Sequence, residues 1–410
     1  MEQTTILYIL LGIVTFDFAL ERILHLLNRK NAKNPIPPEL EGIYDEQGYA
    51  KSQAYLTEIS KFGTFTATLN FVLVFLALSQ GWFGWLDNVV RDYAAISLIT
   101  PLYFFGVLFV ATDILGTPFS LYRQFVIEEK FGFNKMTMKT FWMDKLKGLL
   151  LGAIIGGLLL AVFMALIEFM GNTFWIYFWL VMIAFTLFAN MFYTSLILPL
   201  FNKLTPMEEG ELKSSIQAYC EKVNFPLKNI FIIDGSKRSS KGNAFFSGLG
   251  KRKKVVLYDT LVEKHTTEEL TAVFAHEVGH YKKKHILVST IFSILMMGLM
   301  LYLLSLMIFN SQVSWAMGGV STAVHLNLLA FGILYSPVSH IIGLLGNLLS
   351  RKNEFEADSF AKETYASTPL VTALKKMSSD HLSNLTPHPA YVFVHYSHPT
   401  LLQRVKALLK

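Results

Sequence analysis

The stretch GLLLGAIIGGLLLAVFMALIEFM (residues 148–170), followed after GNT by FWIYFWLVMIAFTLFANMFYTSLILPL (174–200), decides the class of fold. Each run reaches the length of about 20 apolar residues that a helix needs to cross a bilayer. Five further runs reach this length along the 410-residue chain: 6–27, 64–86, 93–115, 286–309 and 326–349. The sequence therefore predicts an all-α membrane protein with seven transmembrane helices.

The composition supports this class and excludes others. Hydrophobic residues make up 52% of the chain and charged residues only 16%, whereas a soluble domain carries about a quarter charged residues. The single cysteine, Cys220, excludes an intramolecular disulfide framework and a cysteine-based zinc cluster. The net charge of +6 is attributed to cytoplasmic loops, and we expect no nucleic-acid partner. No motif for a nucleotide, flavin or haem cofactor is present.

The distribution of lysine and arginine predicts the topology. Segments 28–63, 116–147 and 201–285 and the tail after residue 350 hold nearly all the basic residues. Because basic loops stay in the cytoplasm, we expect the N-terminus outside and the C-terminus in the cytoplasm. An odd number of spans agrees with this orientation.

The spans and loops divide the chain into four parts. These are five transmembrane helices with their loops (1–200), a cytoplasmic insertion (201–285), two more transmembrane helices (286–350) and a cytoplasmic C-terminal segment (351–410).

The cytoplasmic insertion is expected to be a small α/β unit. Residues 229–234 (NIFIID) and 254–259 (KVVLYD) are typical of short strands, with 243–246 as a possible third. Thr266 and Glu269 have the spacing of a capping box and predict the start of a helix.

Two residues inside the spans suggest that these helices are not simple lipid-facing rods. Asp17 is costly in hydrocarbon, and such groups usually face a bundle interior or water. It therefore favours an internal aqueous cavity. Pro337 is expected to kink the last span.

The helix after Thr266 carries the pattern HEVGH, an HExxH motif. His276 and His280 lie four residues apart on one helical face and can bind one zinc ion, while Glu277 reaches the bound water as general base. The alternative is two histidines packed on an amphipathic helix. Lys283 and Ile286 stand where a metzincin would need glycine and histidine, so that class is excluded.

A catalytic zinc needs a third protein ligand and an open position. Glu354 of NEFEAD is the candidate, and Asp358, four residues on, can hydrogen-bond a ligand histidine. Glu356 should point elsewhere, because it lies about 200° round the helix from Glu354. His285 could compete as a ligand, but we expect a solvated neighbour of the lysines before it; Glu354 could itself be only an exposed acid. Since both halves of the site adjoin spans, we expect a gluzincin-type zinc site at the cytoplasmic face.

At this point the sequence resembles a known family, the type I CAAX prenyl proteases, along essentially its whole length. The resemblance rests on motifs in the same order along the chain: PPELEGI (37–43), PFSLYRQFVIEEKFGFNK (118–135), LFNKLTPMEEG (200–210), GSKRSSKGNAFFSG (235–248), HEVGH, NEFEAD and HYSHPTLLQR (395–404). It implies a barrel of seven tilted helices around a large water-filled chamber, with the zinc site at the cytoplasmic end.

The resemblance also implies the roles of site residues. One zinc ion per chain would be held by His276, His280 and Glu354, with Glu277 as general base and Asp358 supporting a ligand.

Three further roles come only from the resemblance. Asn243 looks like the edge-strand residue that holds the substrate, His398 like a donor to the oxyanion, and Arg404 like their partner in the site.

The function expected is a membrane zinc endopeptidase that hydrolyses a peptide bond near the C-terminus of a prenylated CAAX protein. The connection from Asp259 to His276 is shorter than in eukaryotic members, which favours a bacterial protein of the cytoplasmic membrane, expected to be a monomer. A quality-control protease for membrane proteins is the alternative, and a seven-helix transporter or receptor with a vestigial HExxH motif is the remote one.

Overall fold

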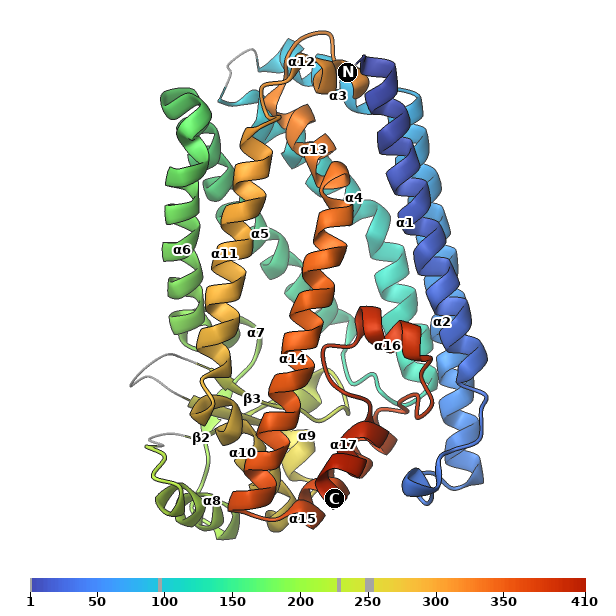
Figure 1. The fold of residues 1–410 in the computed structure, drawn as a ribbon, viewed down its shortest axis with the longest axis vertical. Coiled ribbons are helices and arrows are strands. Elements are labelled where there is room, and N and C mark those ends of the chain that lie inside the picture. The colour runs from blue at the N-terminus through green and yellow to red at the C-terminus, as the bar shows by residue number, and fades with distance from the viewer. Residues whose placement is uncertain (1, 95–97, 227–229, 248–253) are drawn as a thin grey trace.

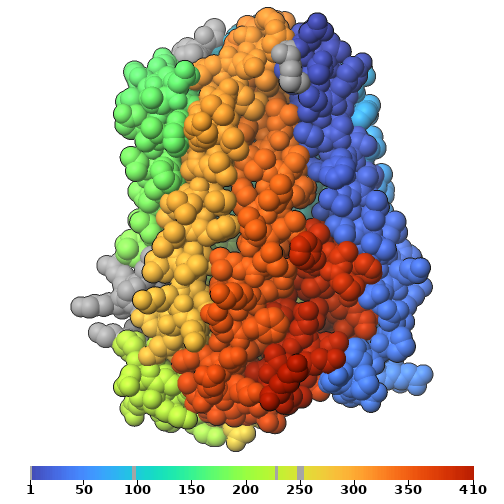
Figure 2. Space-filling model, viewed as in Figure 1, coloured from blue at the N-terminus to red at the C-terminus, as the bar shows by residue number. Residues whose placement is uncertain are grey.

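The computed structural model describes residues 2–410 apart from 95–97, 227–229 and 248–253. Its long helices run beside one another along the long axis of the molecule (Figure 1), and Figure 2 shows the same side in a space-filling view. They are α1 (Gln3–Asn31), α2 (Glu46–Ser79), α4 (Thr100–Tyr122), α5 (Met138–Met170), α6 (Phe174–Phe192), α11 (His285–Ser305), α13 (Val324–Leu334) and α14 (Ser336–Thr364).

Among the described residues, four helical segments are long and apolar enough to cross a membrane. The number is five if α13 and α14, which are bent by 51° beside Pro337, form one broken span. This is fewer than the predicted seven. One of the four, Met138–Phe201, contains both α5 and α6, which are separated by the turn Gly171–Thr173, while α1 is not among them.

The predicted boundaries of two spans differ from those of the helices in the structure. The run 64–86 is interrupted after α2, because Gly81 adopts a left-handed conformation (φ 67°) from which the separate helix α3 (Trp82–Tyr93) begins. Of the run predicted to begin at residue 93, Tyr93 is the last residue of α3, and α4 begins at Thr100. The first break carries only the short polar stretch Ser79–Gly81, which is too short to separate two spans by composition.

Shorter elements gather at the two ends of the bundle. Helix α12 (Ser311–Ala316) lies with α3 at the upper end in Figure 1. The lower end holds α7 (Leu198–Phe201), α8 (Glu211–Lys222), α9 (Asp259–Val262), α10 (Thr267–Lys282), α15 (Ser367–Asp380), α16 (Pro389–His395) and α17 (Leu401–Leu409). Single turns are Pro38–Leu40, Gly171–Thr173 and Gly235–Lys237, and π-helical turns are Arg123–Glu128 and Tyr193–Ile197.

A four-stranded sheet in the order β1-β2-β4-β3 lies at the lower end. Its strands are β1 (Leu204–Pro206), β2 (Ile230–Ile233), β3 (Ala244–Ser247) and β4 (Lys254–Tyr258). β2 and β4 are parallel, and the other pairs are antiparallel. The three strands expected from the sequence are confirmed, β1 was missed, and β3 forms one edge.

Helix α10 is the centre of this lower end. The Thr266 side chain accepts the Glu269 backbone N–H (3.3 Å) and the Glu269 carboxylate accepts that of Thr266 (3.1 Å), so the predicted capping box is present. The helix packs against α8, α14 and α15. A Cβ on Gly279 would lie 2.9 Å from the Ala357 Cα, so α10 and α14 approach as closely as their backbones allow.

The acidic residue inside the first span is paired. Asp17 accepts hydrogen bonds from Ser336 and from His340 (3.1 Å), both on α14. These contacts tie α1 to α14 and account for the carboxylate within the bundle.

Candidate metal centre

The HExxH residues lie on α10 as the spacing predicts. His276 and His280 present their Nε2 atoms to each other at 3.1 Å. His276 is 6% exposed, so it cannot be a solvated surface histidine. The capped start of α10 and its packing on α14 hold both imidazoles on one buried face.

Helix α14 adds the third donor. Glu354, 4% exposed, has one oxygen 3.2 Å from the His280 Nε2 and the other 3.5 Å from the His276 Nε2. His276, His280 and Glu354 form the one group of metal-binding side chains that converges among the described residues. The interpretation of two merely packed histidines, and that of Glu354 as an exposed acid, are both wrong.

The donor set fits zinc. Two nitrogen atoms about 2.05 Å from a tetrahedral ion lie about 3.3 Å apart. Here the two Nε2 atoms lie 3.1 Å apart, and each has a Glu354 oxygen at 3.2 or 3.5 Å. One Glu354 oxygen, Oε2, is buried without a hydrogen-bond partner. A buried carboxylate oxygen normally has a partner, so this oxygen is available for a cation.

Asp358 and Arg404 hold the outer side of His276. The His276 Nδ1 lies 2.8 Å from an Asp358 oxygen, which fixes the proton on Nδ1 and leaves Nε2 free for a metal. Arg404 donates to both Asp358 oxygens, at 2.8 and 2.6 Å. These two hydrogen bonds also raise the pKa of Arg404, against the effect of its burial.

His398 reaches the same cluster from the segment before α17. Its Nε2 lies 3.3 Å from a Glu354 oxygen, while the side chain is 62% exposed. Arg404 lies 3.5 Å from the other Glu354 oxygen. Glu354 is separated from these residues by more than 40 positions in the sequence, and only the fold brings them together.

Glu277 lies on α10 between the two histidines and is partly buried. Burial raises the pKa of Glu277 above its ordinary value, and the neighbouring histidines act in the opposite direction. A carboxyl group with a raised pKa suits a general base.

Asn243 stands apart from the cluster. It is exposed at the start of β3, where its side chain accepts the N–H of Ala244 and its carbonyl accepts that of Tyr258. The described residues show no hydrogen bond from Asn243 to a metal-binding side chain.

His285 differs from its expected position. Instead of being solvated it is 5% exposed, and its Nδ1 lies 3.0 Å from the His280 Nδ1. Its Nε2 lies 3.0 Å from a Glu356 oxygen. Sequence spacing missed this because Lys284 adopts a left-handed conformation (φ 60°) that separates α10 from α11. Glu356 does point away from the three donors, as predicted.

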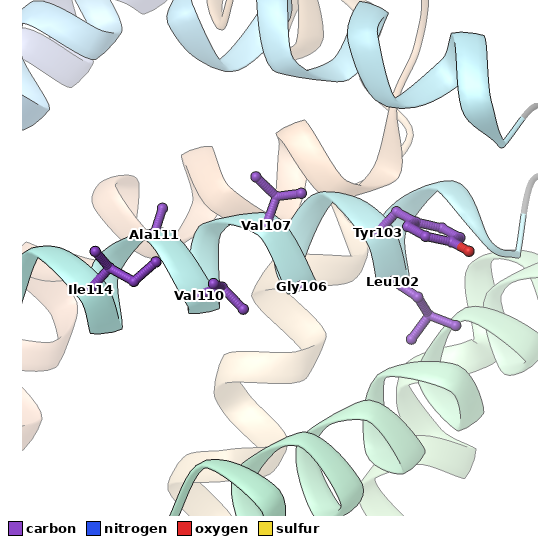
Figure 3. A pocket seen from close by; sticks show the side chains of 7 residues that line it. All are labelled: Leu102, Tyr103, Gly106, Val107, Val110, Ala111 and Ile114. Atoms are coloured by element: carbon purple, nitrogen blue, oxygen red, sulfur yellow. The ribbon is translucent and has the colours of Figure 1, made fainter. Parts of the chain in front are cut away.

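The larger cavities lie elsewhere. Side chains of α4 line one of about 620 Å³, among them Leu102, Val107 and Ile114 (Figure 3). A second, of about 810 Å³, lies between α2, α3 and the same helix. Their walls are mainly apolar and include none of the metal-binding side chains.

Comparison with known proteins agrees with this site. A family model described as "CAAX prenyl protease N-terminal, five membrane helices" matches residues 25–203. The model of peptidase family M48 matches residues 206–410, which include all three metal-binding side chains.

Individual relatives match over most of their length. The probable CAAX prenyl protease 1 of Schizosaccharomyces pombe is 36% identical over 89% of this chain and 80% of its own. CAAX prenyl protease 1 of Saccharomyces cerevisiae is 35% identical, over 93% and 90%. These relatives are eukaryotic, so they give no support to the predicted bacterial origin.

A solved structure has the same fold. The crystal structure of S. mikatae Ste24p superposes with a TM-score of 0.94 and 33% identity, covering 98% of this chain and 99% of the other.

Proposed function

The chain belongs to the CAAX prenyl protease 1 family of M48 zinc metallopeptidases, and we propose that it cleaves prenylated CAAX proteins near their C-terminus. The protein is a membrane zinc metalloprotease with the family's zinc site at His276, His280 and Glu354. The observation that carries the proposal is the convergence of these three side chains, whose nearest nitrogen and oxygen atoms lie 3.1–3.5 Å apart.

We further propose the following roles around that site. A zinc ion held there would polarise the substrate carbonyl and lower the pKa of a bound water to near 7. Glu277 accepts the proton of the attacking water and passes it to the leaving amine. His398, exposed beside Glu354, donates a hydrogen bond to the carbonyl oxygen as negative charge develops.

Arg404, Asp358 and Asn243 act by positioning in this proposal. Arg404 and Asp358 hold the His276 ring through the contacts described above. Asn243 directly precedes the edge strand β3, where an extended peptide can add as a further strand, and would hold the substrate backbone there.

We also propose one zinc ion per chain, a monomer, and seven spans around a water-filled chamber with the zinc end in the cytoplasm. Topology can be mapped with single introduced cysteines. Cys220 does not interfere, since it is buried and burial raises its pKa to about 12. A cysteine near residue 2 should react with an impermeant reagent added outside, and one at residue 410 only after permeabilisation. The reverse pattern would overturn the orientation.

The decisive experiment measures zinc content together with cleavage of a farnesylated CAAX peptide and its unprenylated twin. We expect about one zinc per chain and cleavage that depends on the prenyl group. Glu277→Ala should retain zinc and lose cleavage. Zinc-free protein that still cleaves would remove the mechanism, and equal cleavage of both peptides would remove the proposed substrate class.

A further inference from the structure

The outer nitrogen of His280, Nδ1, contacts the first of two side chains that lie in a row. His285 lies 3.0 Å from it through Nδ1, and the other nitrogen of His285 lies 3.0 Å from the Glu356 carboxylate. Neither residue belongs to the three zinc ligands. This row of contacting side chains leads from His280 on α10 through His285, the first residue of α11, to Glu356 on α14.

A single placement of protons satisfies every contact in this chain. A histidine that binds a metal through Nε2 carries its proton on Nδ1. His280 therefore donates to the Nδ1 of His285. That leaves the His285 proton on Nε2, where it is donated to Glu356. No donor faces another donor, and the terminal acceptor is a carboxylate.

The backbone is shaped to deliver His285 to this place. On one straight helix, residues five apart lie about 140° apart and do not meet. The left-handed Lys284 ends α10 and starts α11 in a new direction, which brings the two imidazoles to a ring-centroid distance of 5.1 Å. A lysine rarely adopts this conformation, so the surrounding packing holds it there.

Helix α14 thereby supports both ligand histidines. Asp358 contacts His276 directly at 2.8 Å, and Glu356 contacts His280 through His285. Both carboxylates, Glu356 and Asp358, follow the ligand Glu354 within four residues on this helix. The His285 side chain is 6% exposed and that of Glu356 is 38% exposed, so the inner member of the chain is shielded and the outer one partly solvated.

We propose that His285 and Glu356 are positioning residues that hold His280 in the tautomer and orientation needed to bind zinc. This inference rests on the proposed zinc site. Partners of this kind typically contribute a factor of about 10–100 in metal affinity when removed.

The test measures zinc affinity of the full chain in detergent by competition with a chelator. His285→Ala and Glu356→Ala should each raise the zinc Kd about tenfold or more. Glu356→Gln should restore much of the affinity, because its amide oxygen still accepts the His285 proton. Glu363→Ala is the matched control, an exposed carboxylate about two turns further along the same helix, and should leave the Kd unchanged.

A second measurement separates positioning from folding. The absorption spectrum of the cobalt-substituted protein should change in His285→Ala, while the melting temperature of the metal-free protein stays close to that of the wild type. Zinc Kd values within twofold of wild type in both alanine variants would overturn the proposal. So would a fall in melting temperature without a change in Kd. A wild-type chain that binds no zinc would instead overturn the proposed function.

Discussion

The two ends of the molecule each hold a buried histidine against a buried aspartate, but among the described residues only the lower end brings three metal-binding side chains together. At the lower end the His276 Nδ1 lies 2.8 Å from Asp358. At the upper end the His325 Nε2 lies 2.7 Å from Asp87, which is fully buried. The pair alone therefore does not distinguish a reactive site from a structural contact.

The neighbours of each pair make the difference. Asp87 also accepts from Arg91 at 2.8 Å, and the His325 ring packs 4.7 Å from Phe104, so the neighbours of this pair are a cation and an aromatic ring. Each end has one buried carboxylate oxygen without a hydrogen-bond partner, Asp87 Oδ2 at the upper end and Glu354 Oε2 at the lower end. At the lower end, however, the other nitrogen of His276 faces the imidazole of His280 and the carboxylate of Glu354. Convergence of three metal-binding side chains, rather than a buried histidine or an unpartnered oxygen, therefore indicates a metal site.

The largest expected effect is at Glu277, the proposed general base at the lower end. Glu277→Gln should lower the cleavage rate by about 10²–10⁴-fold, because the amide cannot accept the water proton. Zinc content should stay at the wild-type value, as measured by metal analysis of the purified chain. Cleavage within tenfold of wild type would show that another group is the base.

The paired aspartates should respond differently to the same substitution. Asp358→Ala should weaken zinc binding by about 10–100-fold, because the proton on His276 loses its acceptor. Asp87→Ala should leave the zinc Kd unchanged and lower the free energy of unfolding by about 3 kcal/mol, since a charged partner is left uncompensated. Chelator competition and thermal unfolding measure the two effects. A similar loss of zinc affinity in both variants would contradict the comparison.

Each end also has a glycine that lies against the backbone of another segment, and the two glycines can be compared by the same substitution. A Cβ on Gly279 would lie 2.9 Å from Ala357, and one on Gly84 would lie 1.9 Å from the Gly318 oxygen. Both alanine variants should lose about 1–3 kcal/mol of stability from overpacking. Only Gly279→Ala should also raise the zinc Kd, because it displaces α10 from α14. Equal zinc binding in both would show that the site tolerates this shift.

The smallest effect is expected at Cys220. Its thiol is buried in the core around α10, and burial raises its pKa to about 12. Alkylation of the folded protein should be negligible and should become complete in denaturant. Rapid labelling of the native chain, followed by mass spectrometry, would show that this core opens.

Much of the lower end could be predicted from local sequence. The capping box of Thr266 and Glu269 encodes the start of α10, and HEVGH places two imidazoles on one face by helical periodicity alone. Glu354 could be nominated because zinc requires a third ligand. The membrane class followed from the apolar runs, but their exact ends did not, because the left-handed Gly81 separates α2 from α3 inside a run long enough to be taken as one span.

The position of His285 shows what local sequence does not contain. Nothing about lysine predicts the left-handed conformation at Lys284, which depends on how α11 packs. The lysines before it predicted a solvated histidine, whereas the bend buries His285 between His280 and Glu356.

The sequence by itself determined that the chain is a membrane protein and which residues can bind zinc, because apolar length and helical spacing are local properties. Only the tertiary structure decided that Asp358, Arg404 and His398 meet those residues, that His325 pairs with Asp87, and that His285 is buried. Those outcomes depend on contacts between segments far apart in the chain, where the backbone path and not the residue spacing sets the distance.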